Sequence, residues 1–282
     1  MNAISMSRLM SRRFALLAVA SAAMLSACSK QETAPAAPAA VPAAAAPAAP
    51  APAKVYVVGT DAAYAPFESV APGGAIEGFD VDVVKAVAAK AGIEVKFVNT
   101  PWEGIFKTLD TGERDMVVSA VTITDERKQT MDFSAPYFSA NQLIAVKKTS
   151  KVAKFDDLKT LKVGVQTGTT GDEVVQKLLG KTSTSIKRFE STPLALKELE
   201  AGGVAAVVAD NGVVQHYIQN NPMAKFKSVS DASFVPEQYG IAMKKGNTEL
   251  AKKVNDALAA IKADGSYDTI HVKYFGTKAA AK

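Results

Sequence analysis

The chain has 282 residues, with 33 lysines and arginines against 28 aspartates and glutamates, two histidines and one cysteine. A single cysteine excludes an intramolecular disulfide, and two histidines beside it are too few for a structural zinc site. With 48% hydrophobic and 22% charged residues, the composition is that of a globular protein and not of a disordered or collagen-like chain. The formal charge of +5 would suggest a nucleic-acid partner only if that charge lay on the folded part.

The first 27 residues have the pattern of a secretion signal. Arg8, Arg12 and Arg13 precede a short apolar run at 14–20, and small residues precede Cys28. The run is shorter than the roughly 20 apolar residues that a permanent membrane span needs, so we expect it to be removed. Leu-Ser-Ala-Cys resembles a bacterial lipobox, which makes Cys28 the expected lipidated first residue. The alternative is an ordinary secretion signal with an incidental cysteine.

Removal of residues 1–27 takes away three of the 33 positive charges and no acid, which leaves 30 against 28 and a charge of +2. We therefore expect no nucleic-acid partner. Residues 28–53 are predicted to form a tether, because 34–53 consist of alanine and six prolines apart from one valine. At a polyproline rise of about 3.1 Å per residue, this tether reaches on the order of 60 Å.

From residue 54 onward, short β-branched runs alternate with helical patterns. Strands are predicted at 55–58, 93–98, 116–119, 143–146, 162–165, 205–209 and 239–243. Helices are predicted at 80–91 with Asp80 as the capping residue, at 172–179, from Thr192-Pro193 to Gly202, and from Thr248. In the last of these, Leu250, Val254, Leu258 and Ile261 fall on one stripe. The alternation predicts an α/β fold with mainly parallel sheets that are covered on both faces.

Ligands of open α/β sheets bind beyond the carboxyl ends of the strands, so polar residues at those ends are candidates for a binding site. The candidate segments are 59–61, 119–122, 166–170 and 210–212.

Four segments in order carry a resemblance to a known family. They are GTDAAYAPFE at 59–68, GFDVD at 78–82, TITDER at 122–127 with DFSAPYF at 132–138, and YDTIHVKYF at 267–275. The chain resembles the bacterial solute-binding proteins of family 3, which serve ABC transporters for polar amino acids. The resemblance implies a two-lobed, type II periplasmic binding protein fold. Lobe 1 would be 54–142 and 240–282, lobe 2 would be 148–236, and the chain would cross between them at hinges 143–147 and 237–240.

The resemblance also implies a division of labour among the site residues. Arg127, helped by the loop with Thr169 and Thr170, would bind the ligand carboxylate, since a guanidinium donates two parallel hydrogen bonds. Asp210, with Ser119 and Thr122, would bind the ammonium group. Without the resemblance, Arg127 also suits a surface charge and Asp210 a helix N-cap.

The ligand side chain would meet the aromatic walls Tyr64 and Trp102 and the carboxylate of Asp61. Trp102 by itself would equally suit core packing. Ala120 and Gln166 stand at positions that differ among family members, so the ligand stays open among glutamine, basic and small polar amino acids. The carboxylate of Asp61 disfavours aspartate and glutamate.

The sequence favours a binding protein over an enzyme. His216 and His271 both lie in helical patterns, and neither a nucleophile elbow nor a P-loop nor a dinucleotide fingerprint is present. Two alternatives remain: a dehydratase that acts on cyclohexadienyl amino acids with the same fold, and an amino-acid sensor that acts in trans. We expect a monomer with no cofactor and no metal, held at the periplasmic face of the envelope by lipid on Cys28. Its expected partners are an amino acid, an inner-membrane ABC permease and the bilayer.

Overall fold

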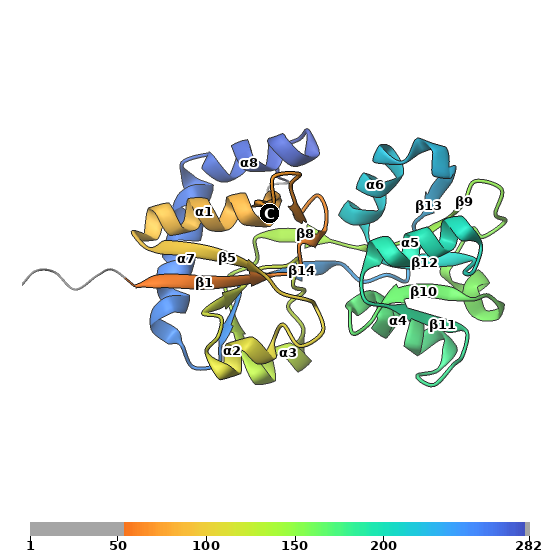
Figure 1. Ribbon diagram of the computed structural model, residues 1–282, viewed down its shortest axis with the longest axis horizontal. Helices are drawn as coiled ribbons and strands as arrows, with labels where there is room; N and C mark the ends of the chain where they lie inside the picture. Colours follow the sequence, from red (N-terminus) through yellow and green to blue (C-terminus); the bar gives the residue numbers. More distant parts are fainter. Residues whose placement is uncertain (1–53, 280–282) are drawn as a thin grey trace, which may run out of the picture. The chain divides into compact units, whose positions relative to one another are not determined.

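The structure is a computed structural model that describes residues 54–279 (Figure 1). The predicted signal sequence, Cys28 and the tether lie outside the described residues. The first of two five-stranded sheets has the order β5-β1-β6-β15-β7. Its strands are β1 (Val55–Thr60), β5 (Glu94–Asn99), β6 (Met116–Val117), β7 (Met131–Phe133) and β15 (Ala242–Lys244).

The second five-stranded sheet has the order β11-β10-β12-β9-β13. Its strands are β9 (Gln142–Lys147), β10 (Val163–Gln166), β11 (Ile186–Phe189), β12 (Ala206–Asp210) and β13 (Phe226–Val229). We call the first sheet with its helices lobe 1 and the second sheet with its helices lobe 2. A three-stranded sheet of β2 (Ala63–Tyr64), β3 (Glu68–Val70) and β4 (Ile76–Glu77) belongs to lobe 1.

Helices cover both sheets (Figure 1). Lobe 1 carries α1 (Phe79–Ala91), α2 (Lys107–Thr111), α3 (Asp125–Thr130), α7 (Thr248–Ala263) and α8 (Ser266–Phe275). Lobe 2 carries η1 (Phe155–Thr160), α4 (Thr170–Leu179), α5 (Thr192–Ala201), α6 (Asn211–Asn220) and η2 (Pro222–Ala224). Helix α1 packs against β5, α7 and α8, while α4 and α5 pack against β10 and β12.

Four of the five strands in each sheet run in one direction. The pairs β1/β5 and β1/β6 are parallel in the first sheet, as are β10/β11 and β10/β12 in the second. Only β15 and β9 run against their neighbours. The prediction of mainly parallel sheets in a two-lobed α/β fold is therefore confirmed, with one reversed strand in each five-stranded sheet.

The chain passes between the two sheets twice, and the two passages pair with each other. Strand β8 (Phe138–Ala140) lies in the first passage and β14 (Glu237–Tyr239) in the second, and they form an antiparallel ribbon. The predicted hinge at 143–147 is wrong, because these residues lie inside β9, between β12 and β13. The apolar side chains of β9 are buried, which requires the middle of a covered sheet and not a hinge. Lobe 2 thus begins at Gln142 and not at residue 148.

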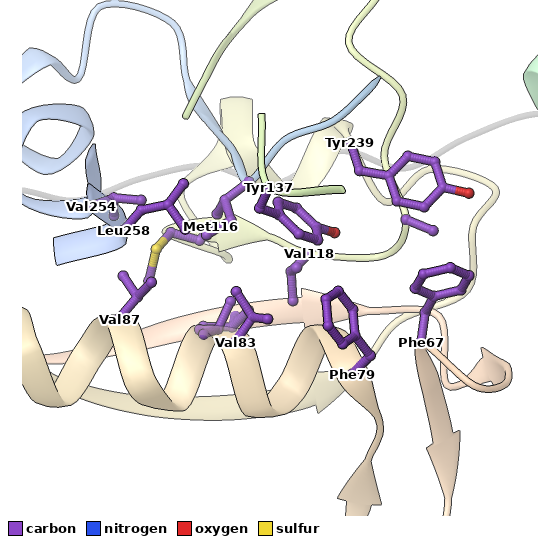
Figure 2. Packing of buried hydrophobic residues seen from close by; sticks show 14 of the residues in the cluster. Phe67, Phe79, Val83, Val87, Met116, Val118, Tyr137, Tyr239, Val254 and Leu258 are labelled. Atoms are coloured by element: carbon purple, nitrogen blue, oxygen red, sulfur yellow. The ribbon is translucent and has the colours of Figure 1, made fainter. Parts of the chain in front are cut away.

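Buried hydrophobic clusters hold the helices against the sheets in each lobe. In lobe 1, aromatic and aliphatic side chains from α1, β6 and α7 belong to one hydrophobic cluster, which also includes Phe67 (Figure 2). Phe67 packs edge-on against Phe79 and Tyr239, with ring centroids 6.1 and 5.3 Å away. In lobe 2, alternate residues of β9 enter different clusters: Ile144 and Val146 one, Leu143 and Ala145 the other. Both faces of the second sheet are therefore buried, as predicted.

Most predicted element positions agree with the structure, including the buried stripe of α7 and the glycine that ends α5. Two differ. Helix α1 begins at Phe79 after Gly78, and Asp80 is a buried first-turn residue and not a cap. The predicted strand 239–243 is two strands, β14 and β15, since residues 240 and 241 pass from the ribbon to the first sheet. Within 54–279, no helix has the length and apolar character needed to cross a bilayer.

Candidate functional site

One pocket gathers residues from the carboxyl ends of strands in both lobes. It has about 320 Å³ of empty space, part of it open to solvent. The lining residues are Asp61, Tyr64, Trp102, Ser119, Ala120, Thr122, Arg127, Gln166, Thr169, Thr170 and Asp210. Every residue predicted for the ligand site therefore lines this pocket.

The lobe 1 wall follows from the adjacency of β1 and β6. Because these strands are parallel neighbours, Asp61 and Ser119, which follow them, meet at one edge. The backbone N–H of Asp61 donates to Ser119 Oγ at 3.0 Å. Burial raises the pKa of the Asp61 carboxyl above its usual range.

Two buried carboxyl groups brace this wall from behind. Ser119 Oγ donates to Glu68 Oε1 at 3.0 Å, and Ala120 N donates to Asp80 Oδ2 at 2.7 Å. Ala120 has φ 47°, a left-handed conformation that glycine adopts most easily. The hydrogen bond to Asp80 holds the backbone in this conformation, and Ala120 lines the pocket.

Arg127 points inward although it belongs to the short, charged helix α3. Its side chain is 9% exposed and lies over the rings of Trp102 and Phe106, with Cζ to centroid distances of 5.4 and 5.3 Å. Nη1 donates to the carbonyl of Thr122 at 3.0 Å. Burial lowers the pKa of this guanidinium, which still stays charged at neutral pH. A guanidinium carries five N–H donors, so Arg127 retains donors for an anion in the pocket.

The lobe 2 wall is built at the ends of the neighbouring strands β10 and β12. Gln166 ends β10, and Thr169 caps α4 by accepting a hydrogen bond from Asp172 N at 3.2 Å. The side chain of Gln166 is held in place by its amide oxygen, which accepts hydrogen bonds from Thr192 N at 3.2 Å and from Thr192 Oγ1 at 3.0 Å. The lobe 2 wall therefore lies at the carboxyl ends of neighbouring strands.

Asp210 ends β12 and is buried. It occupies the N-cap position of α6, but its side chain makes no capping bond. Its carboxylate instead accepts hydrogen bonds from Gln142 Nε2 and from the hydroxyl of Tyr239. Burial, followed by the charge of Glu237, raises the pKa of Asp210 to about 6. A buried carboxylate of this kind is suited to receive a cation.

The two walls touch at the pocket. Gln166 Nε2 of lobe 2 donates to Asp61 Oδ2 of lobe 1 at 3.0 Å. The indole N–H of Trp102 donates to the carbonyl of Gly168 at 3.4 Å, and Arg127 Nη2 donates to the same carbonyl at 3.4 Å. These contacts place the lobes close together across the pocket.

Two polar residues behind the pocket were not predicted from the sequence. Gln142 donates to Asp210, and Glu237 accepts hydrogen bonds from Gln142, Thr122 and Thr170. Glu237 lies in a short strand of the predicted second crossing, where no periodic pattern marks it as buried or as functional. The only signal was its place in that crossing. His216 and His271 lie in α6 and α8, and neither lines the pocket.

Two lobes joined by paired crossings, with one pocket between the carboxyl ends of both sheets, define a periplasmic-type solute receptor. The family of bacterial extracellular solute-binding proteins, family 3, matches residues 56–277. The chain belongs to this family, and the predicted resemblance is confirmed.

Individual relatives are similar along most of the chain. A protein of Neisseria gonorrhoeae named as a probable histidine-binding protein is 46% identical over 90% of this chain and 92% of its own length. Among solved structures, the arginine-, lysine-, histidine-binding protein ArtJ of Geobacillus stearothermophilus has 46% identity and a TM-score of 0.78. That match covers 80% of this chain and 97% of ArtJ.

A second solved structure bears on catalysis. It is an ancestral amino acid-binding protein described as a precursor of cyclohexadienyl dehydratase, with 40% identity and a TM-score of 0.71. The match covers 78% of this chain and 95% of the ancestral protein.

Proposed function

We propose that this chain is the substrate-binding component of an ABC importer and that it binds a basic L-amino acid reversibly between its lobes. The charge of the pocket carries the proposal. Its lining contains one cation, Arg127, and two carboxylates, Asp61 and Asp210. This set complements a ligand with one negative and two positive groups, as in arginine or lysine.

Each group of such a ligand has a partner in the pocket. Arg127 would bind the α-carboxylate with its free N–H donors, because a guanidinium matches a carboxylate in shape and charge. Asp210 would bind the α-ammonium, with Ser119 and Thr122 as further acceptors. Asp61 would bind the distal cation of the side chain.

Aromatic residues would position the rest of the ligand. The ring of Trp102 already lies against a guanidinium, that of Arg127, and Tyr64 is buried and lines the same pocket. A flat ring also attracts a ligand cation through its quadrupole. The names of the histidine-binding relative and of ArtJ support a basic ligand over glutamine or a small polar amino acid.

The proposed cycle involves no chemical step. The carboxylate of Asp210 is held by neighbouring donors, which suits a fixed acceptor and not a group that exchanges protons with a substrate. The dehydratase alternative is tested by incubating the purified protein with cyclohexadienyl amino acids. Saturable turnover that disappears in Asp210→Asn would show that the chain is an enzyme, and the binding proposal would be wrong.

The envelope partners belong to the same proposal. After removal of residues 1–27, a lipid on Cys28 and the tether at 28–53 would hold a monomeric receptor at the periplasmic face. There the loaded, closed receptor would meet the inner-membrane permease. Lobe closure would bend the β8/β14 ribbon. Labelling with a palmitate analogue tests the anchor, since Cys28→Ser should lose the label.

Calorimetry with a panel of L-amino acids tests the ligand class. We expect arginine, lysine and histidine to bind most tightly. Two arginine derivatives then test the site directly: agmatine, which lacks the carboxylate, and N-acetylarginine, which lacks the ammonium charge. Each should bind at least about a hundredfold more weakly than arginine, because each leaves a buried charge unpaired. If no basic amino acid binds, or if agmatine binds as tightly as arginine, the proposal is wrong.

A further inference from the structure

Behind the ligand pocket, the carboxylate of Glu237 joins parts of both lobes. Its Oε2 accepts hydrogen bonds from Thr122 Oγ1 at 2.5 Å and from Thr170 Oγ1 at 2.8 Å. Its Oε1 accepts from Gln142 Nε2 at 2.8 Å. Thr122 and Thr170 also line the ligand pocket, whereas Glu237 lines only the groove behind it.

The two threonines belong to different rigid parts. The segment of Thr122 is tied to the β14 strand, since Ile123 N donates to the carbonyl of Gln238 at 2.8 Å and Thr122 bridges to Tyr239. Thr170 is the first residue of α4, which packs on β10 and β12 in lobe 2. The bond between Glu237 and Thr170 therefore connects the crossing ribbon to lobe 2. Rotation of lobe 2 away from the ribbon must stretch or break it.

We propose that Glu237 is a positioning residue that holds lobe 2 in the closed arrangement through Thr170, and so slows release of the ligand. The proposal rests on the proposed function. Glu237 acts through other residues: it orients the hydroxyl groups of Thr122 and Thr170, and Gln142 links it to Asp210. A carboxylate serves here because it accepts several hydrogen bonds at once, and bonds to a charged acceptor are stronger than neutral ones.

Trp102 provides the assay. It is the only tryptophan of the chain, and its indole N–H donates to Gly168 of lobe 2. Quenching of its fluorescence by acrylamide in the ligand-free protein therefore reports separation of the lobes. Release of L-arginine is followed by stopped-flow displacement.

The test variant is Glu237→Gln, which keeps the shape and removes the charge. Asp156→Asn is the matched control, because Asp156 lines the same groove, is paired with Lys159 on the surface and bonds neither threonine among the described residues. We expect Glu237→Gln to increase quenching and to release arginine about tenfold faster, as loss of a hydrogen bond to a charged group predicts. The control should match wild type, and melting temperatures should show that both variants fold.

Thr170→Val removes the same bond from the other side. If both residues act through one bond, the double variant should be quenched no more than either single variant. Quenching and release at wild-type rates in Glu237→Gln, or additive effects in the double variant, would overturn the proposal. Because quenching is measured without ligand, it tests the role of Glu237 even if arginine fails to bind and the proposed function is wrong.

Discussion

The buried guanidinium of Arg127 offers the sharpest test of the proposed site. Arg127→Met removes the charge and the donors but keeps an apolar chain against the rings of Trp102 and Phe106. Loss of one partner from a buried, hydrogen-bonded charge pair costs about 3–5 kcal/mol, so the Kd for arginine should rise roughly 10²- to 4 × 10³-fold. Lys128→Met is the control, since Lys128 is the next residue of α3 and its ion pair with Asp125 is on the surface.

Stability should respond differently from binding. Burial disfavours the charged form of Arg127, so its removal should leave the melting temperature of the ligand-free protein unchanged or higher. Arginine should then raise the melting temperature of wild type and of Lys128→Met, but not of Arg127→Met. Calorimetry gives the Kd values and thermal scans the stabilities. Wild-type affinity in Arg127→Met would refute the role of the guanidinium, and a large loss of ligand-free stability would show that it is structural.

Three further predictions concern charge and closure. Arginine affinity should fall as the pH drops below about 6, and the fall should approach tenfold per pH unit. The reason is that protonation of Asp210 removes the partner of the ligand ammonium group, while arginine itself does not titrate in this range. Asp210→Asn should therefore flatten the pH profile. In competition assays, Asp61→Asn should weaken arginine and lysine about tenfold more than glutamine, and equal losses would contradict a side-chain role. Gly212→Ala should weaken arginine binding by about 1–3 kcal/mol and leave the melting temperature unchanged. The added Cβ would lie 2.8 Å from the ring of Phe67 in lobe 1. An unchanged affinity would show that the lobes close differently.

Local patterns predicted much of the fold. The stripe of α7 and the glycine that ends α5 were readable because helix periodicity and capping depend on neighbours in the chain. Residues 143–147 show the limit. Their apolar run predicted a strand correctly, but not which sheet it joins, because pairing with β12 and β13 involves residues about 60 to 80 positions away. Asp80 was wrongly predicted to cap a helix for a similar reason. An acid at the start of a helix suits a cap, but the buried carboxylate of Asp80 instead accepts a hydrogen bond from Ala120 N.

The alternation of strands and helices, the family, and the residue types at the strand ends can all be read from the amino-acid sequence. Those ends include Asp61 and Asp210, since parallel strands bring their carboxyl ends together. Arg127 lies in α3 and was predicted only from the family resemblance. What these side chains face depends on tertiary packing: burial against the rings of Trp102 and Phe106 makes Arg127 an inward cation and not a surface charge. The contacts of Glu237 with Thr122 and Thr170 exist only because two crossings bring distant segments to one point, and no local pattern encodes that meeting.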